Sequence, residues 1–317
     1  MRIFAIFSCL AVLAAAPAAA AAGGPPQYAL QGGAGVSTLD GKLHFVAIPG
    51  FAGETTVIES IGSDGSIWNW ASFKGSSGIP MITYRDPAGL SRDGRTLVVQ
   101  SLTSGSPTHF LVLNTRTMGV GEQFTLKGNY SFDALSPDAS RLYLIQRVDA
   151  NNYSRYVVRA YDLKTHSLLP GRIADRTQKS WVMQGDALTR TTSPDGRWVY
   201  TLYMNYGGTP FIHALDSVKG VAHCVGIPWA STDQAGLANV VLTLHGKRLA
   251  VHWRSGKSWL NVDTATWRVS AAAGAGFPWR WLALGAGVLA AAGGLLLLVA
   301  RRRKVSLSDP TLLARAA

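Results

Sequence analysis

The chain has 317 residues, a hydrophobic fraction of 47% and a formal net charge of +12 at neutral pH. With two cysteines in all, a disulfide-based scaffold is excluded, so the fold has to rely on a hydrophobic core, which a chain of this length can supply. Without Arg2, Arg301 to Lys304, Arg315 and Asp309 near the two ends, the sequence contains 24 Lys and Arg and 17 Asp and Glu. The formal charge of this central part is therefore 24 minus 17, or +7. Such a mildly basic surface suits acidic polymers or anionic lipid head groups without being diagnostic of either.

Residues 1–22 have the pattern of a secretory signal peptide. Arg2 supplies the basic start, Ile3 to Leu13 form an apolar run, and small residues follow Pro17. Cleavage near Ala20 or Ala22 is expected, and an uncleaved N-terminal anchor is the alternative. Removal of this segment takes Cys9 with it and leaves one cysteine in the mature chain.

A short pattern returns five times in the central part of the chain: a polar turn, a basic residue and then a run of apolar or alternating residues. Successive turns are 53, 45, 57 and 50 residues apart. Asp-Gly turns flanked by β-branched and aromatic residues are typical of strands joined by tight connections. The turns are centred on Asp40, Asp93, Asp138, Asp195 and His245, and predict strands at 43–48, 96–101, 142–147, 198–203 and 248–253.

Each of these turns has a partner, a second apolar run further along that ends in another polar turn. These runs are 56–65, 110–117, 157–165, 211–218 and 258–266. No window of the central region shows a sustained helical period. A unit of about 50 residues with several short strands is typical of one blade of a β-propeller.

The two best-defined repeats are SPDGRWVYTLY with FIHALD, from Ser193 and Phe211, and SPDASRLYLIQ with VVRAYDLKT, from Ser136 and Val157. They resemble the WD40-like (PD40) repeats of TolB-type and YVTN-type β-propellers. The resemblance implies an all-β fold, a β-propeller of about five blades over residues 27–270, with a sixth blade or a β-sandwich as alternatives. The repeat motif identifies a propeller blade and does not indicate a function. The Ser and Asp of SPDGR are expected to hold a turn between strands.

The segment between the third and fourth repeats, residues 171–190, is longer than an ordinary turn between strands. Arginine and tryptophan are enriched at binding hot spots, and long loops often carry function. The segment is interpreted as an outer strand with its connection, and a ligand-binding surface is the alternative. The candidate binding residues are Arg172, Arg176, Lys179, Trp181 and Arg190.

No catalytic residue, cofactor or metal is predicted. The sequence has no G-x-S-x-G elbow, H-E-x-x-H, phosphate-binding loop or EF-hand pattern, and its seven histidines show no metal-ligand spacing. Cys224 follows His223, but without a second ligand pair we interpret it as an inert cysteine.

Residues 279–300 are predicted to form a transmembrane helix. From Trp281 to Ala300 there are 20 residues without a charge, enough to cross about 30 Å of hydrocarbon. The basic run that follows, Arg301 to Lys304, is expected to stay cytoplasmic under the positive-inside rule. This leaves a short juxtamembrane linker at 271–278 and a basic cytoplasmic tail at 301–317.

These segments together predict a single-pass type I protein of a cell membrane, whose N-terminal domain is extracytoplasmic. The alanine- and glycine-rich composition suggests a bacterial source, and nucleic acid is not expected as a partner of an exported domain. The predicted partners are the lipid bilayer, through residues 279–300, and an envelope protein, peptide or polymer near the membrane. The predicted function is that of a binding or scaffold module. Two alternatives stay open: a lactonase-like or glycan-cleaving enzyme with a site in the central channel, and a signalling or assembly subunit that pairs through its span.

Overall fold

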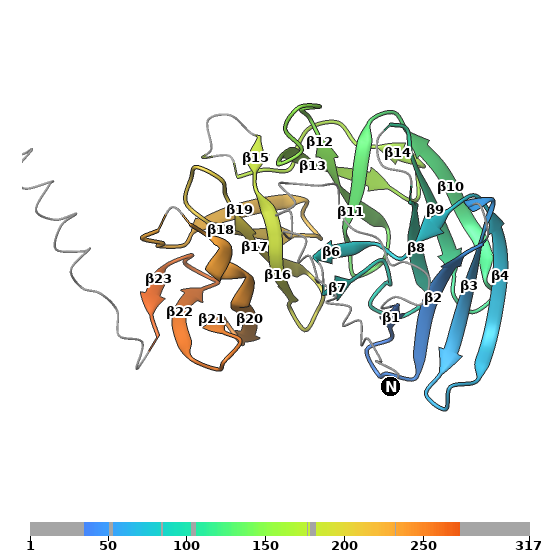
Figure 1. Ribbon diagram of the computed structural model, residues 1–317, viewed down its shortest axis with the longest axis horizontal. Coiled ribbons are helices and arrows are strands. Elements are labelled where there is room, and N and C mark those ends of the chain that lie inside the picture. The colour runs from blue at the N-terminus through green and yellow to red at the C-terminus, as the bar shows by residue number, and fades with distance from the viewer. Residues whose placement is uncertain are drawn as a thin grey trace, which may run out of the picture.

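Short antiparallel strands make up nearly all of the regular structure in the part of the chain that the structure describes. The computed structural model describes residues 35–50, 53–83, 85–102, 106–175, 177, 182–231 and 233–272 (Figure 1). Within these ranges the one helical element is the 3₁₀ helix η2 (Ala235–Asn239). The predicted signal peptide, transmembrane segment and basic tail lie outside the described residues. In the described ranges no helix is long and apolar enough to cross a membrane.

Five antiparallel sheets follow one another along the described chain. The first contains β1 (Val36–Ser37), β2 (Leu43–Pro49), β3 (Thr55–Gly62) and β4 (Ile67–Lys74). The second contains β5 (Ser77–Gly78), β8 (Thr96–Ser101), β9 (Thr108–Asn114) and β10 (Gly119–Leu126). A two-stranded sheet, β6 (Met81–Thr83) and β7 (Asp86–Pro87), is inserted between β5 and β8.

The remaining three sheets repeat the same order. The third contains β11 (Asn129–Leu135), β12 (Arg141–Arg147), β13 (Arg155–Asp162) and β14 (Ser167–Leu168), with β15 (Met183–Gln184) also paired to β13. The fourth contains β16 (Asp186–Thr192), β17 (Trp198–Met204), β18 (Phe211–Asp216) and β19 (Val221–Gly226). The fifth contains β20 (Val240–His245), β21 (Arg248–Trp253), β22 (Ser258–Asp263) and β23 (Val269–Ala271).

The second strands of the middle sheets are buried on both faces, which explains their continuous apolar sequences. Along β12, Leu142 and Leu144 pack in the core shared with the second sheet, while Tyr143 and Ile145 pack in the core shared with the fourth. Successive side chains of a strand point to opposite faces, so a strand between two cores has to be apolar at every position. β8 and β17 show the same unbroken burial.

The first and last sheets differ, because β2 and β21 are buried at alternate positions only. The described residues accordingly form four hydrophobic clusters, one between each pair of successive sheets. Figure 1 shows the sheets fanning around β6 and β7 as the blades of a β-propeller do. The prediction of an all-β propeller with about five blades is confirmed for the described residues, where no sixth four-stranded sheet occurs.

Four of the five repeat turns are held by one recurring set of hydrogen bonds. In each, a hydroxyl donates to the carboxylate two residues later: Thr38 to Asp40, Ser91 to Asp93, Ser136 to Asp138 and Ser193 to Asp195. The hydroxyl oxygen in turn accepts the amide five residues on, and the carboxylate accepts the amide two residues on. The expected structural role of the Ser and Asp in SPDGR is therefore confirmed.

The Ser136 hydroxyl is expected to control the titration of Asp138. Hydrogen bonds, first that from Ser136 and then those from Ser140, lower the pKa of Asp138 from 3.8 to about 2 although partial burial opposes them. Because the folded-state pKa is lowered, this turn contributes stability that is present above the unfolded pKa of about 3.9 and lost as the pH falls through about 2. In a carboxylate NMR titration, Ser136→Ala should raise the pKa of Asp138. Ser193→Ala should instead raise that of Asp195 and leave Asp138 unchanged.

Candidate functional site

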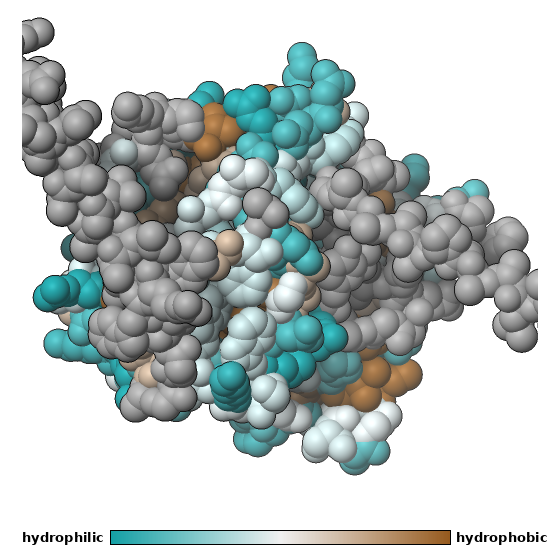
Figure 2. Space-filling view, turned by 60° about the vertical axis from the view of Figure 1, so that its left-hand side comes forward, coloured by the Kyte–Doolittle hydropathy of each residue, from teal (hydrophilic) through white to brown (hydrophobic). Residues whose placement is uncertain are grey.

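A groove with a volume of about 420 Å³ lies between the third and fourth sheets. On the face seen in Figure 2, hydrophobic residues form small separate patches and no continuous surface, so colour alone marks no site. Eleven residues line the groove: Val182, Met183, Gln184, Asn205, Tyr206, Gly207, Gly208, Thr209, Phe211, Cys224 and Gly226. None of these side chains carries a formal charge at neutral pH.

One wall of the groove is the end of the long segment that the sequence singled out. β15 pairs with the start of β13, through Met183 opposite Tyr156 and Gln184 opposite Arg155. Further upstream, the Asp175 carboxylate accepts the backbone amide of Cys224 at 2.8 Å. The segment is thus fastened to the third sheet, where Ile173 also pairs with Val158, and to the fourth sheet.

The opposite wall is the turn between β17 and β18, residues 205–209, and a glutamine from a distant loop holds it in place. Gln234 is 7% exposed and donates to the carbonyls of Asn205 and Gly208, both at 2.8 Å. Its own side-chain oxygen accepts the Asn205 amide at 2.9 Å. At the rim, the Tyr206 hydroxyl donates to Asp186 at 2.9 Å while its ring stays 43% exposed. A fixed wall with an exposed aromatic ring suits recognition.

Cys224 lies at the base of the groove beside His213, at 3.7 Å between Sγ and Nδ1. Burial, and then the charge of Asp175, raise the pKa of the Cys224 thiol to about 12. Burial also lowers the pKa of His213 to about 4. Both groups are therefore neutral at neutral pH. A reactive cysteine requires a lowered thiol pKa, so this pair has the opposite of the electrostatics of a nucleophile.

Of the candidate binding residues predicted from the sequence, the structure describes Arg172 and Arg190. Arg172 is exposed, while Arg176, Lys179 and Trp181 lie outside the described residues. Arg190 lies on β16 with its side chain only 11% exposed, where it donates to the carboxylate and the carbonyl oxygen of Asp133 and to Thr201. The contacts of Arg190 thus join the third and fourth sheets.

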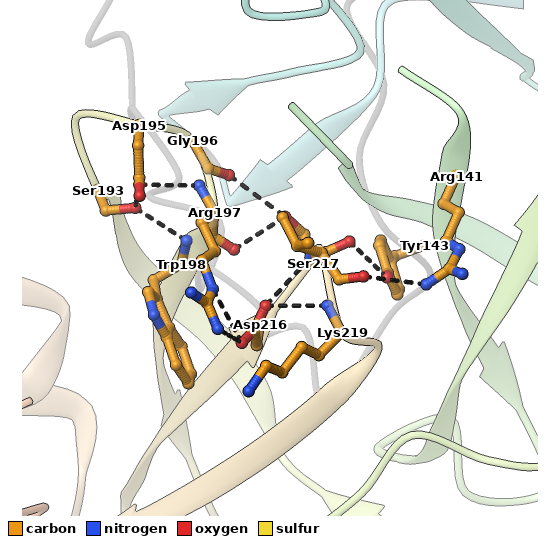
Figure 3. Close-up of polar contacts among 11 residues, drawn as sticks. Arg141, Tyr143, Ser193, Asp195, Gly196, Arg197, Trp198, Asp216, Ser217 and Lys219 are labelled. Atoms are coloured by element: carbon orange, nitrogen blue, oxygen red, sulfur yellow. Dashed lines mark hydrogen bonds and ion pairs between the residues drawn. The ribbon is translucent and has the colours of Figure 1, made fainter. Parts of the chain in front are cut away.

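Figure 3 shows that the basic residue of SPDGR is likewise engaged within the fold. Arg197 donates from Nε and Nη2 to the buried Asp216 carboxylate, at 3.0 and 2.6 Å. Burial raises the pKa of Asp216, but the hydrogen bonds from Arg197 and the Lys219 amide outweigh it, so the pKa is lowered overall. The neighbouring Ser217 carbonyl accepts the Tyr143 hydroxyl of the third sheet at 2.7 Å. This network fastens one blade to the next.

The middle of the propeller is occupied by the inserted hairpin. β6 contacts the inner strands β11 and β16, and Figure 1 shows β6 and β7 at the centre of the fan of sheets. Over the described ranges, no three His, Cys, Asp or Glu side chains come together as a metal site would require. The groove is therefore the best-supported candidate site.

No protein-family model and no curated protein matches the chain. Among solved structures it is similar to hydrazine synthase of Kuenenia stuttgartiensis, with 14% identity and a TM-score of 0.45 over 72% of this chain and 63% of that one. TolB of Acinetobacter baumannii has 17% identity and a TM-score of 0.41 over 74% and 53%. The Cps50 (Swd1) β-propeller domain of Myceliophteria thermophila has 8% identity and a TM-score of 0.44 over 73% and 64%.

The chain is a β-propeller by its own sheets. It spans 53 to 64% of the length of these three proteins, and both the identities and the TM-scores are low. No activity or partner of theirs is therefore transferred to this chain.

Proposed function

We propose that this protein is a membrane-tethered, extracytoplasmic β-propeller that binds a protein, peptide or polymer of the cell envelope in the groove between its third and fourth sheets. The observation that carries the proposal is the chemistry of the groove. Its lining is mainly polar and uncharged, with hydrogen-bonding groups that include Gln184 and Thr209, and the buried Met183 and Phe211 add apolar contacts. Placed polar groups fix the orientation of a ligand and provide specificity.

A binding role is favoured over catalysis by the protonation states at this site. The thiol at the base stays protonated at neutral pH and its histidine partner stays neutral, so neither a thiolate nor a charged acid is available. Gly207 and Gly226 line the groove and are exposed, so no side chain of their own covers their main chain. Main-chain groups of this kind recognise extended peptides and similar neutral polymers.

The tether completes the proposal and is supported by the sequence alone. A run of 20 uncharged residues followed by four basic ones has the features of a single span with a cytoplasmic stop. A propeller fixed in this way would meet ligands that are themselves held near the membrane.

Tyr206→Ala is expected to abolish ligand capture while the fold is retained. Full-length protein in nanodiscs would be exposed to fractionated envelope proteins, peptides and peptidoglycan fragments, and bound material measured by pull-down and then by titration. Removing an exposed tyrosine from the rim should weaken binding by about ten-fold or more. Thr209→Trp, which fills the groove, should act in the same direction.

The matched control is Tyr153→Ala, because Tyr153 is 39% exposed on another loop of the third sheet and does not line the groove. Equal capture by all three variants and the unaltered protein would show that the groove is not the binding site. Absence of any captured ligand from every fraction would count against the binding function itself.

A further inference from the structure

Three tryptophans gather at one end of the fifth sheet. The Trp259 ring stacks on Trp253 with centroids 5.6 Å apart and meets Trp229 edge-on at 5.5 Å. All three pack against the core between the fourth and fifth sheets and remain partly exposed. The Trp229 indole nitrogen donates to the Asp233 carbonyl at 2.9 Å, which fixes its orientation.

The described chain ends at this cluster. The amide of Ala272 donates to the carbonyl of Trp259 at 3.1 Å, and β23 ends one residue earlier, at Ala271. Eight residues, 273–280, separate this point from Trp281, where the uncharged run of the predicted span begins. Fully extended, such a connection reaches about 30 Å. The tryptophan end of the fifth sheet is therefore the part of the described fold nearest to the predicted span along the chain.

A basic turn adjoins the same cluster. Residues 254–257 connect β21 to β22, and the turn is closed by hydrogen bonds of 2.8 Å between Trp253 and both Gly256 and Lys257. Arg254 and Lys257 are exposed, and within the described ranges neither forms an ion pair with a carboxylate. Asp233, whose backbone carbonyl accepts the Trp229 indole nitrogen, is an exposed acidic residue at the same cluster.

We propose that these five residues, Trp229, Trp253, Trp259, Arg254 and Lys257, form a bilayer-contact surface that binds the interface of a membrane containing anionic lipids. Tryptophan rings are enriched at the head-group level of membranes, and basic residues beside them are attracted to anionic head groups. This inference rests on the membrane tether in the proposed function. It adds that the propeller is held in one orientation, with the end of its fifth sheet on the lipid surface.

The test uses the full-length protein in nanodiscs of phosphatidylcholine mixed with phosphatidylglycerol. A nitroxide attached at Ser255→Cys, in the basic turn, should collide less often with an aqueous nickel chelate than a label in water does. It should collide more often with oxygen, which is concentrated in the bilayer. The same label at Ser63→Cys, an exposed position in the turn between β3 and β4, should remain fully accessible to nickel. Unsubstituted protein supplies the background label, because its one described cysteine, Cys224, is only half-buried.

Charge reversal provides the second arm. Arg254→Glu with Lys257→Glu should restore nickel accessibility at residue 255, whereas Lys74→Glu with Lys127→Glu, both exposed elsewhere, should not. If the protein enters the discs and the label at residue 255 is as accessible to nickel as the label at residue 63, the bilayer-contact surface is refuted. The membrane tether would not be contradicted by that result. Protein that fails to enter the discs would instead contradict the tether. Shielding of residue 255 that is equal in pure phosphatidylcholine and unaffected by charge reversal would overturn the role of anionic lipids.

Discussion

Asp133→Ala is expected to lower the free energy of unfolding by about 3–5 kcal/mol. Asp133 is 2% exposed and its partner Arg190 is 11% exposed, so the pair is buried between the third and fourth sheets. Without the carboxylate, the guanidinium keeps its bonds to the Asp133 carbonyl and to Thr201 but loses its counter-charge. An unpaired buried charge is far costlier than a missing surface contact.

Denaturant unfolding followed by the near-ultraviolet signal of the buried tyrosines would measure this loss. Lys42→Ala is the matched control, because the Lys42–Asp40 ion pair is 3.3 Å long with side chains 79% and 54% exposed. Exposed pairs contribute no more than about 1 kcal/mol. The double variant Asp133→Leu with Arg190→Met should recover most of the loss, since apolar replacement of a whole buried pair is often neutral. A single-variant loss as small as that of Lys42→Ala would disprove the assignment.

The second strand of each blade was predictable from the sequence, because burial on one or both faces gives it an alternating or continuous apolar pattern. Predicted strands 198–203 and 248–253 correspond to β17 (Trp198–Met204) and β21 (Arg248–Trp253). The outermost strands gave no such signal. β10, with the sequence GVGEQFTL, is exposed or half-buried along its whole length.

In the fifth repeat, a short glycine hairpin replaces the hydroxyl–carboxylate turn of the other four repeats. Where the other copies use a hydroxyl and a carboxylate, β20 and β21 are joined directly across Gly246 and Lys247, with His245 opposite Arg248. Gly246 has a φ of +58°, a conformation that glycine adopts without strain. The loss of the aspartate in this copy therefore marks a shorter hairpin, and the blade is complete.

Trp68 and Trp70 do not pack between blades. They are 73% and 61% exposed on β4, the outer strand of the first sheet. Aromatic alternation identified the strand, but it carried no information about which neighbour, if any, would cover it. A cross-strand irregularity between Ser60 and Ile61 also shifts the pairing beside Trp68.

Sequence patterns could not predict the groove, because the residues that form its walls are far apart in the sequence and come together only in the folded chain. Gln234 fixes the turn at Asn205 from 29 residues away, and Asp175 reaches Cys224 across 49. The long segment 171–190 supplies one wall of the groove, yet the side chains predicted there to bind a ligand are charged and aromatic ones. The groove is instead lined by neutral groups, including the Tyr-Gly-Gly-Thr turn, residues 206–209, that the repeat pattern passed over.

Gly185→Ala is expected to destabilise the protein by about 2–4 kcal/mol. Gly185 joins β15 to β16 with a φ of +142°, a region that side chains with a Cβ rarely occupy. A Cβ there would lie 2.1 Å from the Met204 carbonyl oxygen and 3.1 Å from its carbon. Because both atoms belong to the backbone of β17, relief requires a strand to move, and the Gly185 amide would then lose its 3.0 Å bond to Ser154.

Gly171→Ala separates the two contributions to this loss of stability, which are the positive φ and the clash of the Cβ with the backbone. Gly171 also has a positive φ, +87°, but a Cβ there would meet no atom within 4 Å. It should therefore lose only the conformational part, about 1–2 kcal/mol. Thermal and denaturant unfolding of both variants would compare them directly, and the excess loss at Gly185 measures the backbone clash. Equal losses at the two positions would mean that β15 can shift freely against β17, in which case the wall of the groove at Gln184 would not be rigid.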